Sequence, residues 1–405
     1  MACRVSRLLI IDLCVGAGRF SVAFPLLFCD ESRHQHYRPE QKLCSKGSLD
    51  RLDPGRRFSW NCCFACCDTG KVRRVGEVDG FDWWSLTTCE TVTRIAVPLF
   101  FMVSGYLAIG RCVKHGDSAY AWKRGLRIMA IALFWTVAFL FWTMIRTKVG
   151  FSFASLIDTG QASPVKFVLD VFYGEAYFHL WFLWALAGIF FVTPIVAQGL
   201  SSLTQRQKVI IGCLLPILVA FDYALHRQSV QVNYFRYSLL SMGVPYLAYT
   251  CSGYLLGVGV KRCWTGLSIV VYCAAFSICL WAYSFLVGQN PTEVANVDFA
   301  DKWLFMPFSI PVCLMSIAGF LMIAKSSLAS SSKMPKVVSR LARDSMGIYI
   351  LHPFVLDIAN YFDLLGRRPN AFVGTLLVTT VVVLGAWGAT AALAKVPVMK
   401  KTISL

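Results

Sequence analysis

Two histidines in apolar sequence are the side chains of this chain best suited to moving a proton. His352 lies near the middle of the apolar segment 345–362, and Ser345, Tyr349 and His352 share one helical face through spacings of four and three residues. An ionisable group inside a membrane helix is costly, which indicates a function. We therefore take His352, with Tyr349, as a candidate catalytic group acting as base or proton relay. The alternative is a neutral histidine that hydrogen-bonds a neighbouring helix.

The second histidine, His179, begins another apolar segment on its outer side, four residues after Glu175. Residues four apart in a helix can pair across one turn. Because aromatic faces stack on sugar rings, His179 and Trp181 are candidates for binding or acting on a sugar. The alternative is an aromatic belt, formed by Tyr177, Trp181 and Trp184, that holds the helix at the membrane interface.

Arg124 and Arg127 form an Arg-x-x-Arg pair at the inner end of an apolar segment. Guanidinium groups bind phosphate oxygens through two parallel hydrogen bonds, so the pair predicts a site for a phosphorylated ligand at the cytoplasmic side. The alternative is ordinary positive charge flanking a membrane helix.

The segment RIAVPLFFMVSGY, residues 94–106, combines an arginine, a proline, two adjacent phenylalanines and a Ser-Gly pair, none of which a plain membrane anchor needs. Ser104 and Gly105 are small enough to let helices approach closely, whereas Arg94 is costly in a membrane unless it meets a partner or ligand. Arg94 and Ser104 are ten residues apart, or about 15 Å along a helix, so they cannot contact the same atom. We interpret Arg94 as a residue that either binds the acceptor substrate on the outer side or has a structural role. We interpret Ser104 as a packing or hydrogen-bonding residue rather than a nucleophile.

The composition indicates a polytopic membrane protein. Of 405 residues, 57% are hydrophobic and 15% are charged, and the mean hydropathy is +0.58. We predict an all-α bundle of nine to ten transmembrane helices, because spans need about 17 to 25 apolar residues. The nine clear segments are 91–109, 128–145, 180–197, 209–225, 238–260, 264–287, 304–324, 345–362 and 371–394.

The basic residues predict the orientation. One alternate set of connecting loops carries seventeen lysines and arginines, including the loop at 325–344, and the opposite set carries eight. Since these residues are retained on the cytoplasmic side, we expect a cytoplasmic C-terminus. The net charge of +17 is then mostly a matter of topology and contact with membrane lipid. We do not expect a nucleic-acid partner.

Residues 1–80 differ from the rest, so we divide the chain into an atypical region, 1–80, and a membrane domain, 81–405. Segment 8–28 is a poor candidate span because it contains Asp12, Arg19 and Pro25. The region also holds clustered thiols, Cys62, Cys63, Cys66 and Cys67. A single Cys-x-x-Cys without a second pair is a weak zinc signal, and we assign no metal site.

Four motifs resemble the acyltransferase 3 family of integral-membrane O-acyltransferases. They are TRIAVPLFFMVSGYL at 93–107, FHLWFLWALAGIFFVTPI at 178–195, ADKWLF at 300–305 and SMGIYILHPFV at 345–355. The resemblance runs from about Trp83 to the C-terminus and is greatest to the bacterial type that O-acetylates the enterobacterial common antigen. It implies transfer of an acyl group, such as acetyl, from cytoplasmic acyl-CoA to a glycan or lipid-linked sugar at the bacterial inner membrane. Acyl-CoA is then a donor substrate, and no cofactor is permanently bound.

The chain departs from the family in one respect. The family's first helix carries an arginine followed eleven residues later by a histidine, and none of the six histidines here has an arginine at that spacing. Residues 1–80 are either a translation of a misread frame or truly divergent. Two alternatives to the enzyme therefore remain. One is a catalytically silent relative, and the other is a transporter, although the repeated halves typical of transporters are not visible.

Overall fold

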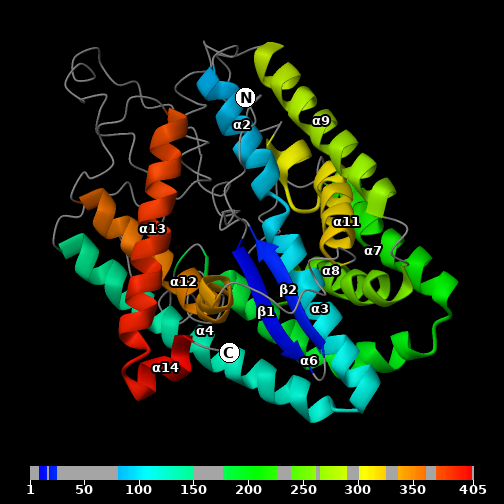
Figure 1. Ribbon diagram of the computed structural model, residues 1–405, viewed down its shortest axis with the longest axis horizontal. Helices are drawn as coiled ribbons and strands as arrows, with labels where there is room; N and C mark the ends of the chain where they lie inside the picture. Colours follow the sequence, from blue (N-terminus) through cyan, green and yellow to red (C-terminus); the bar gives the residue numbers. More distant parts are fainter. Residues whose placement is uncertain are drawn as a thin grey trace.

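The computed structural model describes residues 9–15, 18–24, 81–148, 177, 179–226, 239–260, 265–289, 301–324, 336–361 and 371–403. Helices packed side by side form nearly all of this part (Figure 1). Within it, seven helices are long and apolar enough to cross a membrane, which confirms a polytopic helical bundle. They span Thr87–His115, Ser118–Thr143, Trp181–Ser201, Gln205–Leu225, Thr265–Leu286, Trp303–Ala324 and Phe372–Leu393.

Each of the nine expected segments contains a helix within the residues that the structure describes. The helices are α2 (Phe81–Thr93), α3 (Ala96–His115), α4 (Ser118–Lys148), α6 (Trp181–Ser201), α7 (Gln205–His226), α8 (Leu239–Gly259), α9 (Thr265–Gln289), the π-helix η5 (Asp301–Phe305), α11 (Ile310–Ala324), α12 (Lys336–Tyr361), α13 (Ala371–Leu393) and α14 (Pro397–Ile403). Two of the long helices, α8 and α12, are not among the seven apolar spans, and neither is the short helix α14. Both can carry polar groups because they pack against other helices, α8 against α3, α6 and α7, and α12 against α13.

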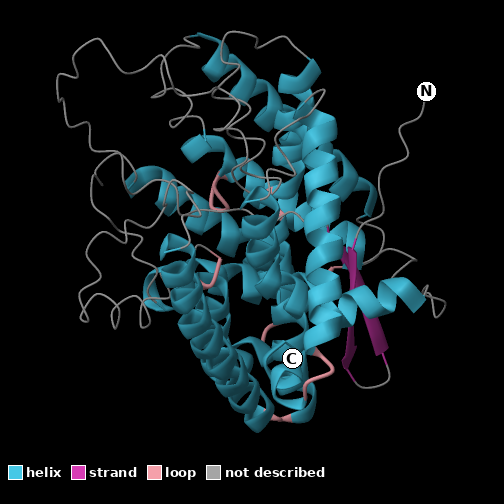
Figure 2. Ribbon diagram, turned by 90° about the vertical axis from the view of Figure 1, so that its left-hand side faces the viewer, coloured by secondary structure: helices cyan, strands magenta, loops and turns pink. Residues whose placement is uncertain are grey.

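The N-terminal segment at 8–28 does not form the helix that a span would require. Strand β1 (Leu9–Val15) pairs antiparallel with strand β2 (Gly18–Phe24), and Val15 lies opposite Gly18 at the turn. The hairpin lies at the side of the helices in Figure 2. Asp12 and Arg19 lie within its strands and argue against a lipid-spanning helix, as the sequence already indicated. The clustered cysteines at 62–67 lie outside the described residues.

A proline bends the first membrane span. Pro98 has no N–H to donate to the carbonyl of Arg94, and its ring crowds that carbonyl, so a straight helix cannot continue through this point. Helix α2 accordingly ends at Thr93, and α3 begins at Ala96. The next regular bond runs from the N–H of Leu99 to the carbonyl of Ile95, at 2.9 Å. Arg94 therefore lies at a bend.

Glycines bring α3 and α8 into backbone contact. A Cβ atom at Gly105 would collide with the backbone of Thr250, and one at Gly253 would collide with the backbone of Met102. These two glycines face each other's helices, which confirms the expectation that Gly105 permits a close approach. Ser104 is half-buried beside it. The crossing fixes α8 against the middle of α3.

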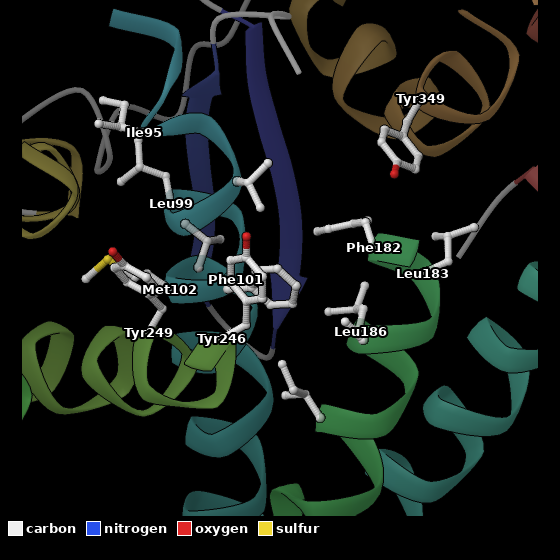
Figure 3. Close-up of a cluster of buried hydrophobic side chains, with 14 of the residues drawn as sticks. Ile95, Leu99, Phe101, Met102, Phe182, Leu183, Leu186, Tyr246, Tyr249 and Tyr349 are labelled. Carbon is white, nitrogen blue, oxygen red and sulfur yellow. The ribbon is translucent and has the colours of Figure 1, made fainter. Parts of the chain in front are cut away.

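Aromatic side chains fill the space next to this crossing (Figure 3). The ring of Tyr246 on α8 stacks on Phe101 of α3 at 4.4 Å between centroids and on Trp181 of α6 at 5.4 Å. Trp181 is only 4% exposed. It therefore belongs to the protein core, which is not where an interfacial belt residue would lie. Through this stack, α8 holds the start of α6 against α3.

Filling the helix crossing should destabilise the protein. We expect Gly105→Ala to lower the free energy of unfolding by about 1 to 3 kcal/mol, because overpacking forces the backbones apart. Gly388→Ala is the matched control, since a Cβ there meets no atom within 4 Å. Thermal unfolding of both variants in detergent would check this. Equal melting temperatures for the two variants would contradict a tight α3–α8 contact.

Candidate active site

A proline on α12 determines how His352 is held. Pro353 lies inside the helix and lacks the N–H that would otherwise bond to the carbonyl of Tyr349, four residues earlier. The Nδ1 atom of His352 lies 2.6 Å from that carbonyl oxygen. The imidazole thus takes the place of the missing backbone donor.

This hydrogen bond fixes the tautomer of His352. A carbonyl oxygen only accepts hydrogen bonds, so Nδ1 carries the proton and the lone pair of the neutral ring lies on Nε2. An imidazole whose Nδ1–H is held by the backbone carries its lone pair on Nε2, which is the form in which histidine acts as a general base. The side chain is 7% exposed, so it is held within the protein.

The second histidine lies beside the first. His179 is 4% exposed, and its ring centroid lies 5.4 Å from that of His352. The hydroxyl of Tyr349 donates a hydrogen bond to the backbone carbonyl of His179. Figure 3 shows the Tyr349 ring directed from α12 toward the start of α6. The structure therefore brings together His352, His179 and Tyr349, the three residues proposed as catalytic from the sequence.

A buried carboxylate, Asp357, completes this part of the protein. One of its oxygens accepts hydrogen bonds from the hydroxyl of Tyr177, at 2.6 Å, and from the indole N–H of Trp142, at 2.8 Å. Asp357 is 5% exposed. Asp357 is not among the site residues predicted from the sequence, although an acidic side chain within an apolar segment was a usable signal.

Trp181 and Glu175, the other residues proposed to bind a sugar, do not join the histidine pair in the described part of the structure. Trp181 lies in the aromatic stack with Tyr246, so its ring faces are occupied by protein on the side of α8. Glu175 lies outside the described residues, and its pairing with His179 stays a prediction. His179 instead has aromatic neighbours, with ring centroids at 5.0 Å for Phe139 and 5.7 Å for Tyr177.

Arg94 is held by protein groups at the bend between α2 and α3. Its guanidinium forms an ion pair with Glu90, one turn earlier, and both side chains are buried. The guanidinium carbon also lies 5.1 Å from the ring centroid of Phe305 at the end of η5. Of the two interpretations of Arg94, these contacts favour the structural one, because a buried ion pair with a cation–π contact ties α2 to η5.

The Arg-x-x-Arg pair lies at the opposite end of α4 from the histidines. Arg124 is half-buried and Arg127 is exposed. Nearby, the guanidinium of Arg111 lies 4.0 Å from the ring centroid of Tyr120 and bonds to Asp117 at 3.2 Å. The short turn from α3 to α4 is thereby fixed, at the lower edge of Figure 1. We call this region, with Arg111, Arg124 and Arg127, the basic end of the bundle.

Helix α4 connects the basic end with the histidine pair. Arg127 and Phe139 are twelve residues apart on α4, or about 18 Å along its axis. Phe139 packs its ring against His179. A ligand bound by phosphate at the basic end and reaching the histidines would therefore have to span about 18 Å.

Comparison with known proteins assigns the chain to a family. The family described as an acyltransferase domain matches residues 71–391. The chain belongs to the acyltransferase 3 family. It is also similar to nodulation protein NolL of Mesorhizobium japonicum, at 22% identity over 318 residues that cover 75% of this chain and 76% of that protein. No solved structure matches the acyltransferase.

The sequence motifs of the acyltransferase contact one another in space. Phe182 of the second motif lies 5.1 Å from Phe101 of the first and 5.2 Å from Tyr349 of the fourth, between ring centroids. Phe305 of the third motif contacts Arg94 of the first. The motifs thus form one connected interior region, and the histidine pair lies where the second and fourth meet.

Replacing Pro353 should raise the stability of the protein and lower its rate of acyl transfer. Pro353→Ala supplies an N–H for the Tyr349 carbonyl, which should stabilise the acyltransferase by up to about 3 kcal/mol. The same N–H competes with His352 for its hydrogen bond, so the rate of acyl transfer should fall. Pro245→Ala, at the interior proline of α8, is the control. Unfolding temperature and rate measured together would check this, and a Pro353→Ala variant with full activity would contradict it.

Proposed function

We propose that the protein is a membrane O-acyltransferase that moves an acyl group, such as acetyl, from acyl-CoA to a hydroxyl of a glycan or lipid-linked sugar. The observation that carries the proposal is the buried pair of histidines, 5.4 Å apart between ring centroids, in a member of an acyltransferase family. The expected setting is a bacterial inner membrane, with the basic end on the cytoplasmic side, where acyl-CoA is found.

The proposed reaction needs a proton acceptor, and His352 fits that requirement. Its Nε2 takes the proton of the acceptor hydroxyl while the hydroxyl oxygen bonds to the thioester carbonyl carbon. The resulting oxyanion re-forms the carbonyl as the carbon–sulfur bond breaks, and the imidazolium returns the proton to the leaving sulfur. His179, packed against the same ring, is the second candidate for proton transfer or for binding the acceptor.

The proposed donor site is the basic end. Arg124 and Arg127 would bind the phosphates of coenzyme A, since guanidinium groups match phosphate oxygens bidentately. The thioester lies at the far end of a long flexible arm in this donor. The distance of about 18 Å along α4 between Arg127 and Phe139 suits a ligand of that form.

A catalytically silent relative is the second candidate function. It is favoured by one observation, which is that the arginine and histidine of the family's first helix are missing from the sequence. The family match begins at residue 71. Without that motif, an active chain would rely on His352 and His179, with Tyr349 beside them, for proton transfer.

Labelled acetyl-CoA would test the proposed function. We expect the purified full chain to transfer or hydrolyse the acetyl group. We also expect His352→Gln to lower kcat by about 100- to 10,000-fold, the usual contribution of general base catalysis. His115→Gln, at an exposed histidine, is the matched control. A wild-type protein without transfer or hydrolysis would support the silent relative, and full activity in His352→Gln would exclude His352 as the base.

The donor site has its own test. The double variant Arg124→Ala and Arg127→Ala should weaken acyl-CoA binding by about 2 to 4 kcal/mol, because charge-assisted hydrogen bonds contribute roughly 1.5 to 3 kcal/mol each and are not fully additive. The measurement is the KM for acyl-CoA in correctly inserted protein. Lys123→Ala, which removes an exposed cation from the same turn, is the control. An unchanged KM in the double variant would mean that the pair serves membrane topology alone.

A further inference from the structure

Asp357 is a buried acid for which the proposed reaction has no direct use. It lies on α12, five residues after His352, and is 5% exposed. Burying a carboxylate among apolar helices is costly unless hydrogen bonds compensate it. Its position next to the histidine pair therefore calls for an explanation.

The hydrogen bonds of Asp357 join three separate segments at one oxygen atom. Tyr177 precedes α6, Trp142 is on α4, and Asp357 itself is on α12. The 2.6 Å distance from the Tyr177 hydroxyl lies within the normal range of O–H···O hydrogen bonds. The carboxylate thus compensates its own burial by binding the parts of the protein that surround His179.

The segment with Tyr177 and His179 is held by α12 at two points. Asp357 binds the Tyr177 side chain, and the Tyr349 hydroxyl binds the carbonyl of His179. Asp357 and Tyr349 are eight residues apart, or about 12 Å along the helix. The segment itself is a short turn, in which the N–H of Leu180 bonds to the carbonyl of Tyr177 at 3.1 Å. Two anchors on one rigid helix fix both the place and the orientation of such a turn.

We propose that Asp357 is a positioning residue for the histidine pair. By binding Tyr177 it holds His179 against His352, and by binding Trp142 it keeps α4, with Phe139, closed over the His179 ring. The catalytic part of this proposal rests on the proposed acyl-transfer function. The positioning part does not, because the contacts exist whatever reaction the site performs.

The first experiment measures the position of His179 without any activity. The rate at which diethyl pyrocarbonate modifies His179 is followed by mass spectrometry in the full chain in detergent. We expect Tyr177→Phe and Asp357→Leu to raise that rate at least tenfold, because the turn loses an anchor and the ring becomes accessible. Asp344→Asn is the matched control, since Asp344 on the same helix also accepts an indole N–H, from Trp387 at 3.0 Å.

The second experiment measures catalysis in the same variants. We expect Tyr177→Phe to lower kcat by about 10- to 100-fold with little change in the KM for acyl-CoA, because small misplacements of reacting groups are costly. Asp357→Asn should retain more activity than Asp357→Leu, since an amide oxygen still accepts one hydrogen bond. A merely structural role would lower the amount of folded enzyme and leave kcat per folded molecule unchanged.

The outcomes separate the two claims. Faster modification of His179 in the variants, together with a lower kcat, supports the proposal. If the wild-type protein shows no acyl transfer, faster modification in the variants still supports the positioning role, and only the proposed function fails. Protection of His179 in both Tyr177→Phe and Asp357→Leu would overturn the positioning role. Faster modification with an unchanged kcat would overturn its catalytic part.

Discussion

A polar group among membrane helices has to find its hydrogen-bond partner within the protein, and the interior of this acyltransferase is organised by that constraint. Pro353 leaves the Tyr349 carbonyl without its helical donor, and His352 supplies one. Asp357 is buried, and Tyr177 and Trp142 bind it. In each case a buried polar group that would destabilise the protein without a hydrogen-bond partner fixes the position of the side chain that supplies the bond. The histidine pair is the result of these compensations.

Packing around the site follows from very small and very large side chains. Gly105 and Gly253 let α3 and α8 touch through their backbones. The aromatic rings beside them then fill the space between α3, α6 and α8, with Tyr246 stacked on both Phe101 and Trp181. Because Trp181 is the first residue of α6, this stack also fixes where the turn with His179 begins. A rigid start of α6 is needed for His179, in the turn before it, to stay in contact with His352 of α12.

Helix α4 gives the proposed site its length. It carries the arginines at the basic end and the Phe139 ring that covers His179. A donor with phosphate at one end and a thioester at the other is matched by such an arrangement, since the two functions are held apart on one rigid element. Arg94 has a different role, because it pairs with Glu90 one turn earlier and contacts Phe305, which holds the bend in the first span to η5.

The sequence by itself determined the helical membrane architecture, the family and the candidates for catalysis. Apolar length and composition suffice for the first, since a membrane leaves few alternatives to helices. Motif identity sufficed for the others, and His179, His352 and Tyr349 do converge. The sequence also indicated that segment 8–28 was a poor span, but it could not give the hairpin.

Only the tertiary structure decided how these residues are used. It placed Trp181 in the core, brought Arg94 to Phe305, and brought Tyr177 and Trp142 to Asp357. The physical reason is that such partners are as many as 215 positions apart in the chain, as Trp142 and Asp357 are. Helical periodicity relates residues three or four positions apart, so it can propose a face of a helix but not what that face meets.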